Sequence, residues 1–437
     1  MKLQIEKVVY GGAGLAHPAK GEATGMAVLV PFTLPGELVE ASATESKGGV
    51  VTAELTQIVE ASSDRVKPRC VHFGECGGCQ YQHANYKTQL EIKTEILRET
   101  LERAGLAQLP EVQVHAGAPW EYRNRIRLRV AKVDGVLRMG YLRRGSNNFL
   151  PIEMCPIASP LLLQAAEALL NLVGDPDAAL WAKAIVEVEF FTTSDESKLQ
   201  MILYTRQKSV AGFNLLCDRL QKVLPTLVGA GVLMLRAEAS QQGRRTERPK
   251  ALAAWGADGV SYEAAGEKYW VSRGGFFQVN RWLVEELVRI VAAGRRGALA
   301  WDLYAGVGLF SRALKKSFDE VVAVEAAADD LVKTFKGGGR RAVAATTVEF
   351  LRDAVVQRER PELVVMDPPR AGVGAEVCAL LGRVNAKEIV YVSCDPVTLA
   401  RDLKALIDCG YRINELHMVD MFPQTFHQET VVVLGRP

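Results

Sequence analysis

The sequence predicts an α/β protein with a doubly wound, mostly parallel sheet in its C-terminal part, a central α/β region and a small N-terminal β-barrel. Three observations support this prediction. After about residue 270, short apolar runs alternate with helical stretches, as in buried parallel strands joined by helices. The first 62 residues contain short β segments separated by glycine and proline turns. With 437 residues, the chain is long enough for two to four domains.

The N-terminal region, 1–62, is expected to form an OB-like barrel. Its β segments are separated by Gly11-Gly12 and by a turn that contains Pro31 and Pro35. Several short strands with turn signals between them are typical of small barrels. A β module that has only a packing role is the alternative. The candidate strands are 4–9, 26–30, 37–40 and 50–55.

The central region, 63–265, begins with a predicted helix over 85–104 and continues with a basic strand. Arginine occupies every second position of this strand, so that all four arginines share one face. A cationic face can bind the phosphate backbone of RNA. A solvated face whose arginines pair with acids elsewhere is the alternative. The arginines are Arg123, Arg125, Arg127 and Arg129.

The C-terminal region, 266–437, contains the predicted doubly wound sheet. Such sheets bind ligands at the carboxyl ends of their strands. Polar or reactive residues occur at these positions here, among them Asp302, Glu325, Asp367 and Cys394. The candidate strands are 298–303, 320–324, 363–366, 389–392 and 431–434.

The composition and the hydropathy of the chain indicate where the protein is located and in which redox state its cysteines are. The 53 Lys and Arg against 51 Asp and Glu give a net charge of +2, which neither indicates nor excludes a nucleic-acid partner. We find no run of ~18 apolar residues and no apolar signal segment after Met1, so we expect a cytoplasmic protein without a membrane span. Its eight cysteines are then reduced thiols, metal ligands or catalysts rather than disulfides.

A glycine-rich turn follows the predicted strand at 298–303 and opens a helix. Gly306 and Gly308 let the backbone turn tightly and approach a ligand, and Tyr304 precedes them. Glu325 ends the next strand, where an acid can accept hydrogen bonds from a ribose diol. The pair resembles the cofactor site of class I S-adenosylmethionine (SAM)-dependent methyltransferases, which are Rossmann-like. A purely structural turn is the alternative.

Two further turns carry possible chemistry. Asp367-Pro-Pro resembles the motif with which amino-group methyltransferases hold a planar base, but Arg370 replaces their aromatic residue. Cys394 ends the next strand, just before a helix whose N-terminus favours a thiolate. A thiolate that adds to carbon 6 of uracil makes carbon 5 nucleophilic, and a base must then remove the carbon 5 proton. Glu429 is the candidate base. A buried thiol and a solvated acid are the alternatives.

Four cysteines have the spacing of metal ligands, and Gly77-Gly78 would let the chain wrap around a metal centre. All-cysteine ligation suits a [4Fe–4S] cluster or a structural zinc ion. The spacing differs from two Cys-x2-Cys pairs, which favours iron–sulfur over zinc; unligated buried thiols are the further alternative. The four are Cys70, Cys76, Cys79 and Cys155.

Taken together, these residues resemble the RNA uracil-C5-methyltransferase family, the TrmA/RumA group, over nearly the whole chain. The resemblance also includes Tyr122-Arg123-Asn124-Arg125 and Phe276-Phe277-Gln278-Val279-Asn280. It implies a SAM-dependent enzyme that methylates carbon 5 of uridine in RNA, with Cys394 as nucleophile and Glu429 as general base. It also implies that residues 1–62 are an RNA-binding TRAM domain and that the four cysteines hold a [4Fe–4S] cluster. The implied SAM and uracil pocket comprises Gln278, Tyr304, Gly306, Gly308, Glu325 and Asp367.

By analogy, a barrel together with a cluster favours 23S ribosomal RNA over transfer RNA as substrate, and we expect a monomer. The sequence departs from the family pattern at Leu309, where many members carry a polar residue, and in the segment after Glu325. An RNA-binding iron–sulfur protein without catalysis is therefore one alternative. Cysteine-dependent methylation of cytosine is another, although Arg370 stands where such enzymes usually carry a second cysteine.

Overall fold

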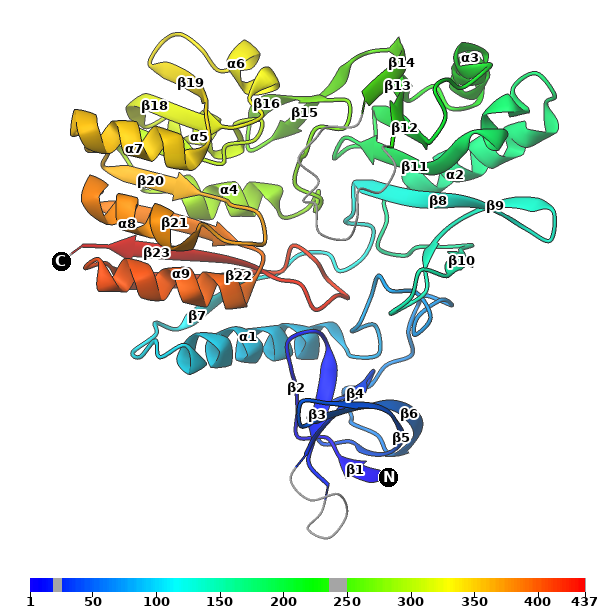
Figure 1. Ribbon diagram of the computed structural model, residues 1–437, viewed down its shortest axis with the longest axis horizontal. Coiled ribbons are helices and arrows are strands. Elements are labelled where there is room, and N and C mark those ends of the chain that lie inside the picture. The colour runs from blue at the N-terminus through cyan, green and yellow to red at the C-terminus, as the bar shows by residue number, and fades with distance from the viewer. Residues whose placement is uncertain (19–25, 236–249, 437) are drawn as a thin grey trace. The chain divides into compact units, whose positions relative to one another are not determined.

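The computed structural model describes residues 1–18, 26–235 and 250–436. The chain divides into two compact units: residues 1–119 with 351–437, and residues 120–350. Helix α7 (Thr347–Gln357) passes from the second unit into the first. Each unit is a mixture of helices and strands, labelled in Figure 1.

The first unit begins with a six-stranded sheet in the order β1-β5-β6-β4-β3-β2. All neighbours are antiparallel except β4 and β6, which run parallel. Alternate residues such as Leu3, Val28 and Val39 are buried, because strand side chains alternate between the two faces. The strands are β1 (Lys2–Gln4), β2 (Lys7–Val8), β3 (Ala13–Ala16), β4 (Ala27–Pro31), β5 (Leu38–Lys47) and β6 (Val50–Glu60).

Helix α1 (Tyr86–Arg103) follows this sheet and matches the predicted helix at 85–104. Asn85 caps it, since its side chain accepts a hydrogen bond from the Thr88 backbone N–H at 2.9 Å. Ile96, Leu97 and Leu101 are buried on one face, and the helix packs against α9. The α1 helix therefore ties the N-terminal part of this unit to its C-terminal part.

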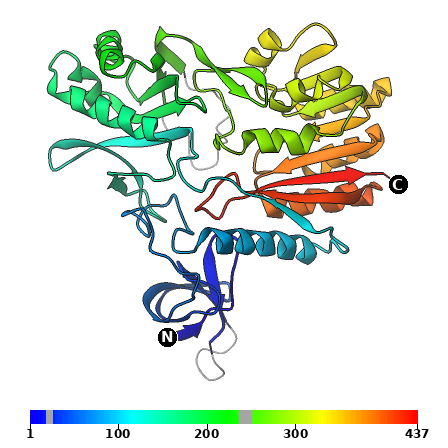
Figure 2. The ribbon, with the colours of Figure 1, turned by 180° about the vertical axis from the view of Figure 1, so that it is seen from behind.

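The C-terminal part of the first unit contains strands in the order β20-β21-β23-β22-β7. Strands β20 and β21 are parallel, whereas β21, β23 and β22 are antiparallel neighbours, and Figure 2 shows β22 and β23 side by side in red. Every residue of β20 and β23 is buried, as predicted from their continuous apolar runs. The elements are β7 (Val112–His115), β20 (Leu363–Met366), α8 (Gly374–Val384), β21 (Glu388–Ser393), α9 (Pro396–Asp408), β22 (Arg412–Val419) and β23 (Glu429–Gly435).

The second unit contains a seven-stranded sheet in the order β10-β9-β8-β11-β12-β13-β14. Helices α2 (Pro160–Asn171) and α3 (Phe213–Val223) pack on one face, where Leu162, Phe190 and Leu216 belong to one apolar core. The strands are β8 (Arg125–Val133), β9 (Val136–Leu142), β10 (Phe149–Pro151), β11 (Ile185–Thr192), β12 (Leu199–Thr205), β13 (Leu227–Met234) and β14 (Lys250–Gly256); two short 3₁₀ helices lie at Leu172–Gly174 and Ala179–Lys183.

The rest of the second unit is a hairpin followed by three parallel strands in the order β19-β18-β17. Across the parts of the chain that the structure describes, no helix has both the length and the apolarity to span a bilayer. The elements are β15 (Gly259–Ala264), β16 (Glu267–Ser272), α4 (Val284–Ala292), β17 (Gly297–Leu303), α5 (Leu309–Leu314), β18 (Phe318–Glu325), α6 (Asp329–Thr334) and β19 (Arg340–Ala344).

Candidate active site

Cys394 lies in the turn between the end of β21 and the start of α9 and is partly buried. Local sequence explains this turn. One oxygen of Asp395 accepts hydrogen bonds from the N–H groups of Val397 and Thr398, both at 3.0 Å, and Pro396 occupies the first helical position. The thiol is therefore presented at the N-terminus of a capped helix, as the sequence predicted.

Two carboxyl groups and one guanidinium group affect the pKa of the Cys394 thiol. The pKa of Cys394 is raised to about 12, mainly by burial and also by the carboxyl groups of Glu429 and Asp367. Arg370 opposes this shift, because its positive charge and its hydrogen bond to the sulfur stabilise the thiolate. The predicted nucleophile, the predicted base and Asp367 are thus brought together within the first unit, and Arg370 joins them.

Glu429 is the first residue of β23 and is almost completely buried. Burial is the main cause that raises its pKa well above the ordinary value, and the nearby Asp367 raises it further, whereas Arg370 lowers it. Its Oε1 atom has no hydrogen-bond partner among the described residues. A buried, unpaired carboxyl group with a raised pKa is suited to exchange a proton with a bound substrate.

The loop after β20 carries Asp367 and Arg370, and side chains of α9 hold it in place. Thr398 donates a hydrogen bond to the Arg370 carbonyl at 3.0 Å. The buried Asp402 accepts hydrogen bonds from the N–H groups of Val373, at 2.8 Å, and Gly374, at 3.2 Å. Because α9 also begins next to Cys394, one helix positions both the nucleophile and the loop that carries its charged neighbours.

The segment that leads to Glu429 is held by residues near α1 that the sequence analysis did not identify. The Gln424 carbonyl accepts hydrogen bonds from the N–H groups of Gln80 and Tyr81, each at 3.0 Å. The side chains of Gln89 and Gln424 bond to each other at 3.0 Å. Lys93 and Asp420, both fully buried, form an ion pair at 2.5 Å. No local sequence pattern predicts these pairs, because more than 300 residues separate their members.

The glycine turn of the second unit joins β17 to α5. Tyr304, Gly306 and Gly308 all have positive φ, at 62°, 55° and 84°. A positive φ in a tyrosine is uncommon and often marks a functional site. A Cβ on Gly308 would lie 3.0 Å from the Leu331 side chain, so the turn also requires a small residue there. Leu309 follows as a buried residue at the start of α5.

Glu325 and the glycine turn come together as expected within the second unit. Its Oε2 accepts a hydrogen bond from Gly306 N–H at 3.0 Å, and its Oε1 accepts one from Ala327 N–H at 2.9 Å. Carboxylate oxygens retain lone pairs for further donors such as ribose hydroxyls. The turn and the acid therefore fit the ribose end of SAM.

Gln278 is buried, and Asn124 holds its backbone. Asn124 Nδ2 donates to the Gln278 carbonyl at 3.0 Å, and the Asn124 backbone N–H donates to the Val279 carbonyl at 2.9 Å. The two sequence motifs 122–125 and 276–280 are thus neighbours in the second unit. Gln278, Tyr304 and Glu325 remain predicted pocket residues.

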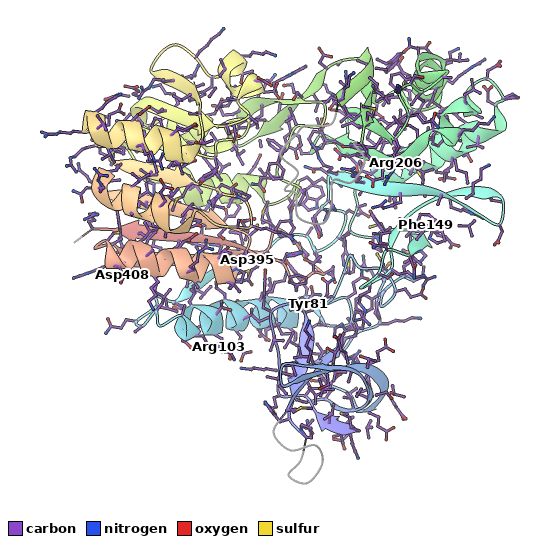
Figure 3. The ribbon with its side chains drawn as sticks, in the orientation of Figure 1. Tyr81, Arg103, Phe149, Arg206, Asp395 and Asp408 are labelled. Atoms are coloured by element: carbon purple, nitrogen blue, oxygen red, sulfur yellow. The ribbon has the colours of Figure 1, made fainter. Side chains whose placement is uncertain are left out.

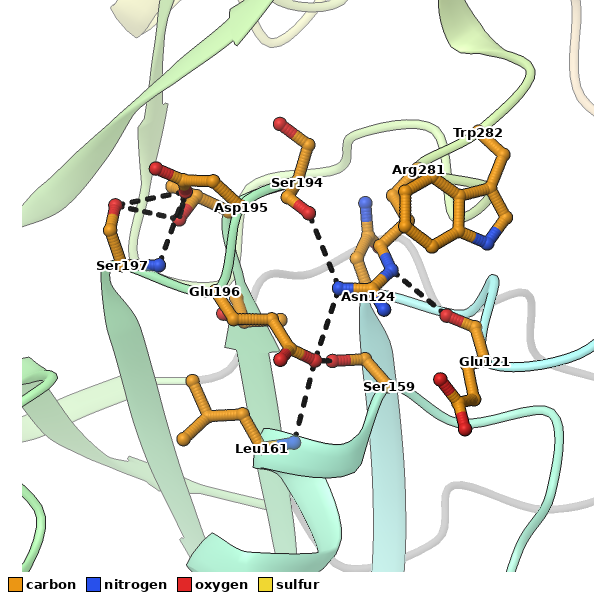
Figure 4. Close-up of polar contacts among 12 residues, drawn as sticks. Glu121, Asn124, Ser159, Leu161, Ser194, Asp195, Glu196, Ser197, Arg281 and Trp282 are labelled. Atoms are coloured by element: carbon orange, nitrogen blue, oxygen red, sulfur yellow. Dashed lines mark hydrogen bonds and ion pairs between the residues drawn. The ribbon is translucent and has the colours of Figure 1, made fainter.

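Arg281, which the sequence analysis missed, connects several segments of the second unit (Figure 4). It donates to the Glu121 carbonyl at 2.9 Å and the Ser194 carbonyl at 3.2 Å, and it pairs with Glu196 at 3.0 Å. The guanidinium also stacks on the Trp282 ring, 4.2 Å from the ring centroid. Glu196 accepts a further hydrogen bond from Ser159 at the start of α2. This network stabilises the segment that carries Gln278.

The basic strand is β8, which holds Arg125, Arg127 and Arg129 on one face, as predicted from their spacing, whereas Arg123 precedes the strand. Arg125 pairs with Glu189 at 2.7 Å, while Arg127 and Arg129 pair with Glu187 on the neighbouring strand β11. The fourth, Arg123, donates from Nε to the Arg125 carbonyl at 3.0 Å. Acidic residues on β11 thus pair with arginines of this face, as in the alternative of a solvated face with acidic partners. The RNA-binding role of the arginines remains a prediction.

Three of the four candidate cluster ligands, Cys70, Cys76 and Cys79, lie on one loop of the first unit, and Cys155 belongs to the second unit. Cys70 and Cys76 lie close enough for the charge of one to raise the pKa of the other, although burial is the larger cause. Within residues 1–18, 26–235 and 250–436, no three or more His, Cys, Asp or Glu side chains are grouped as a metal site requires. No formed cluster site is thus observed among the described residues, and we derive no chemical step from one.

Comparisons with known proteins place the chain in a family. Residues 341–437 match the family described as tRNA (Uracil-5-)-methyltransferase. The chain is 33% identical to the 23S rRNA (uracil(1939)-C(5))-methyltransferase RlmD of Pectobacterium carotovorum, over 94% of this chain and 89% of the relative. This chain belongs to the RNA uracil-C5-methyltransferase family. An uncharacterized RNA methyltransferase of Aquifex aeolicus is 32% identical over 99% of the chain and 98% of the relative.

A solved structure shows the same fold for this RNA uracil-C5-methyltransferase. It is the tRNA (uracil-54, C5)-methyltransferase of Pyrococcus abyssi in complex with S-adenosyl-L-homocysteine. The TM-score is 0.76, the sequence identity is 24%, and the similarity covers 99% of this chain and all of that one. The predicted SAM-dependent methyltransferase fold is therefore confirmed, and so is the predicted class of enzyme.

Proposed function

We propose that this enzyme methylates carbon 5 of a specific uridine in RNA through a covalent adduct between Cys394 and carbon 6 of the uracil. The observation that carries the proposal is the group formed by Cys394, Glu429, Asp367 and Arg370, in which each acid affects the pKa of the thiol. A nucleophile, a base and a compensating cation are the parts that this chemistry requires. The family relationship supports the same conclusion.

The proposed sequence of steps assigns one role to each side chain. SAM supplies an electrophilic methyl group, and its sulfur–methyl bond breaks on transfer, so that S-adenosyl-L-homocysteine is the leaving group. The Cys394 thiolate adds to carbon 6 and shifts electron density to carbon 5, which takes the methyl group. Glu429 then removes the proton from carbon 5, the carbon–sulfur bond breaks, and the thiolate is released. Arg370 stabilises the anionic sulfur at the start and the end of the cycle.

The pKa values indicate when the thiolate forms. The raised pKa of about 12 keeps the Cys394 thiol protonated in the free enzyme near neutral pH, and burial also raises the pKa of Glu429, which favours its protonated form. We propose that the positive sulfonium of SAM favours ionisation of both groups. Gln278, Tyr304, Gly306, Gly308, Glu325 and Asp367 are the proposed pocket residues. This order of events would prevent a free thiolate from reacting before the methyl donor is present.

We further propose 23S ribosomal RNA as the substrate, since the RlmD relatives of Pectobacterium carotovorum and Halomonas elongata carry that substrate in their names. Transfer RNA is the second candidate, because the Pyrococcus abyssi enzyme and the matching family are named for it. Residues 1–62 are the proposed RNA-binding TRAM module, ahead of a central region (63–265) and a catalytic region (266–437). The arginine-lined face of β8 is a second proposed RNA contact.

The test is methyl transfer from labelled SAM to separately purified 23S ribosomal RNA and transfer RNA that lack the modification. We expect label in ribosomal RNA, recovered as 5-methyluridine when the nucleosides are separated by mass. Cys394→Ala should lower transfer at least ~10³-fold, whereas Cys409→Ala, which alters a thiol at the end of α9, should not. Label in 5-methylcytidine, or full activity of Cys394→Ala, would contradict the proposed chemistry.

The [4Fe–4S] cluster on Cys70, Cys76, Cys79 and Cys155 remains a separate prediction. Its support is the chemistry of four reduced thiols, three of them on one loop. The measurement is the iron, sulfide and zinc content of protein purified without oxygen, together with its visible absorption. Four iron and four sulfide ions per chain would confirm the cluster, and one zinc ion per chain would favour a structural zinc site. Protein that contains no iron and no zinc would show that the thiols are unligated.

A further inference from the structure

Tyr10 joins the N-terminal sheet to the turn that carries the proposed nucleophile. Its hydroxyl donates a hydrogen bond to Oδ2 of Asp395 at 3.1 Å, although 385 positions separate the two residues. Both residues belong to the first unit and are partly buried. Asp395 directly follows Cys394 and caps α9; Figure 3 labels Asp395 next to the start of this helix and Asp408 at its end.

Both oxygens of Asp395 are used, and they have different partners. Oδ1 accepts from the N–H groups at the start of α9 and caps the helix, whereas Oδ2 accepts from Tyr10. Its backbone is also held, because the Ser393 hydroxyl donates to the Asp395 carbonyl at 3.1 Å. These contacts hold Asp395 in one conformation and so restrain the backbone next to the preceding residue, Cys394.

The loop that carries Tyr10 is shaped to reach this turn. It connects β2 to β3 and contains Gly11 and Gly12, with φ of 103° and 89°. A Cβ on Gly12 would lie 2.9 Å from the Cβ of Gln80, so a larger residue would push the loop away. The Tyr10 ring meets Phe426 edge to face, with 5.4 Å between the ring centroids.

The contacts of Tyr10 thus involve both catalytic segments. Asp395 follows the proposed nucleophile, and Phe426 lies three residues before the proposed base, Glu429. Tyr10 and Phe426 both pack against an apolar cluster that includes Tyr81, Ile92 and Ile96. Burial and the negative charge of Asp395 raise the pKa of Tyr10, so its hydroxyl stays protonated and remains a donor at any physiological pH.

We propose that Tyr10 is a positioning residue for methyl transfer, which through Asp395 orients the turn that presents Cys394. This inference rests on the proposed function and assigns the N-terminal sheet a part in the chemical step, beyond any binding of RNA. A module that only binds RNA would affect KM, whereas a residue that orients the nucleophile affects kcat.

The first experiment compares Tyr10→Phe with Tyr81→Phe in the full-length enzyme. Tyr81 is the matched control, since it lies in the same cluster and its hydroxyl has no hydrogen-bond partner among the described residues. We expect Tyr10→Phe to lower kcat about five- to tenfold, as for one lost charge-assisted hydrogen bond, with KM for RNA within about twofold. Tyr81→Phe should resemble the wild type.

The second experiment is a double-mutant cycle with Asp395→Asn, which keeps a residue that caps helices well. If Tyr10 acts through Asp395, the double variant should lose no more activity than the more impaired single variant. The alkylation rate of Cys394 by iodoacetamide without RNA, followed on its peptide by mass spectrometry, should change in Tyr10→Phe and not in Tyr81→Phe.

Several results would overturn the inference. These are an unchanged Tyr10→Phe enzyme, an effect confined to KM, equal losses in Tyr10→Phe and Tyr81→Phe, or losses that multiply in the double variant. An inactive wild-type enzyme would instead remove the proposed function and this inference with it. An active wild type with a normal Tyr10→Phe variant would remove the inference alone.

Discussion

The Nη2 atom of Arg370 lies 3.2 Å from Nε2 of His427. This pair connects the loop after β20 to the segment that precedes β23, and so it connects the neighbours of Cys394 to those of Glu429. An arginine can only donate, so Nε2 of His427 is the acceptor in this contact. The Phe426 ring, with its centroid 4.0 Å from that of His427, completes the packing.

Glu429→Gln should separate the two halves of the reaction. Glutamine has nearly the same shape but cannot take a proton, so the methylated adduct should form and fail to break down. We expect turnover to fall about 10²- to 10⁴-fold and a protein–RNA complex that resists denaturation to accumulate. The measurement is a denaturing gel of enzyme incubated with RNA and labelled SAM.

The control for this prediction is Glu415→Gln, which alters a half-exposed acid on β22 and should leave turnover unchanged. Normal turnover by Glu429→Gln, or loss of activity without a trapped complex, would show that another group acts as the base.

Arg370→Gln should slow the reaction of Cys394 with iodoacetamide. Arg370 lowers the pKa of the thiol, so its loss raises that pKa further. A nearby opposite charge is typically worth one to three pKa units, so the thiolate fraction at pH 8 should fall at least ~10-fold. Below the pKa, the rate should rise about tenfold per pH unit in both proteins, with the variant displaced to higher pH.

Arg352→Gln is the matched control for this charge, because Arg352 forms an exposed ion pair with Glu376. Its alkylation profile should superimpose on that of the wild type. Superimposed profiles for Arg370→Gln would contradict the stabilisation of the thiolate by this arginine.

Lys93→Met should destabilise the first unit, since it leaves the buried carboxylate of Asp420 without its cation. Removing one partner of a buried ion pair costs about 3–5 kcal/mol. The free energy of unfolding from urea titrations measures this loss. The double variant Lys93→Met with Asp420→Leu should recover much of it, because no buried charge then remains unpaired.

Lys87→Met provides the exposed comparison. Lys87 pairs with Glu91 at 3.4 Å on the surface of α1, where such pairs contribute well under ~1 kcal/mol. A loss for Lys93→Met as small as that for Lys87→Met would show that the buried pair contributes little.

Asp302→Asn should flatten the pH dependence of stability. Burial raises the pKa of Asp302 from 3.8 to about 7, although hydrogen bonds from Ser311 oppose this. Between pH 4 and pH 7 the folded chain then holds a proton that the unfolded chain has lost, so stability decreases as pH rises through this range. The contribution is about 1.4 kcal/mol per pH unit, or roughly 4 kcal/mol in all.

The measurement is the free energy of unfolding of wild type and Asp302→Asn at several pH values from 4.5 to 7.5. Other groups also titrate, so the informative quantity is the difference between the two proteins. That difference should change steadily across the range. Parallel curves would show that Asp302 has an ordinary pKa.

Local sequence patterns determined the elements that position the site. The apolar run at 363–366 is β20 as predicted, and the runs at 298–303 and 389–392 are the cores of β17 and β21. These patterns are informative because a strand buried on both faces must be apolar along its length. Local motifs next to strand ends also identified Cys394 as the candidate nucleophile and Glu429 as the candidate base.

Only the tertiary structure showed which charged and polar groups contact the residues predicted from the sequence. The period of two in β8 places its arginines on one face, but only the pairing with β11 brings Glu187 and Glu189 beside them. Likewise, Arg370 is four residues from a strand end in the sequence, and only packing places it against Cys394. Tyr10 and Asp395 meet across 385 positions. Such contacts depend on how whole elements pack, and a local sequence pattern carries no information about the distant partner that an element will meet.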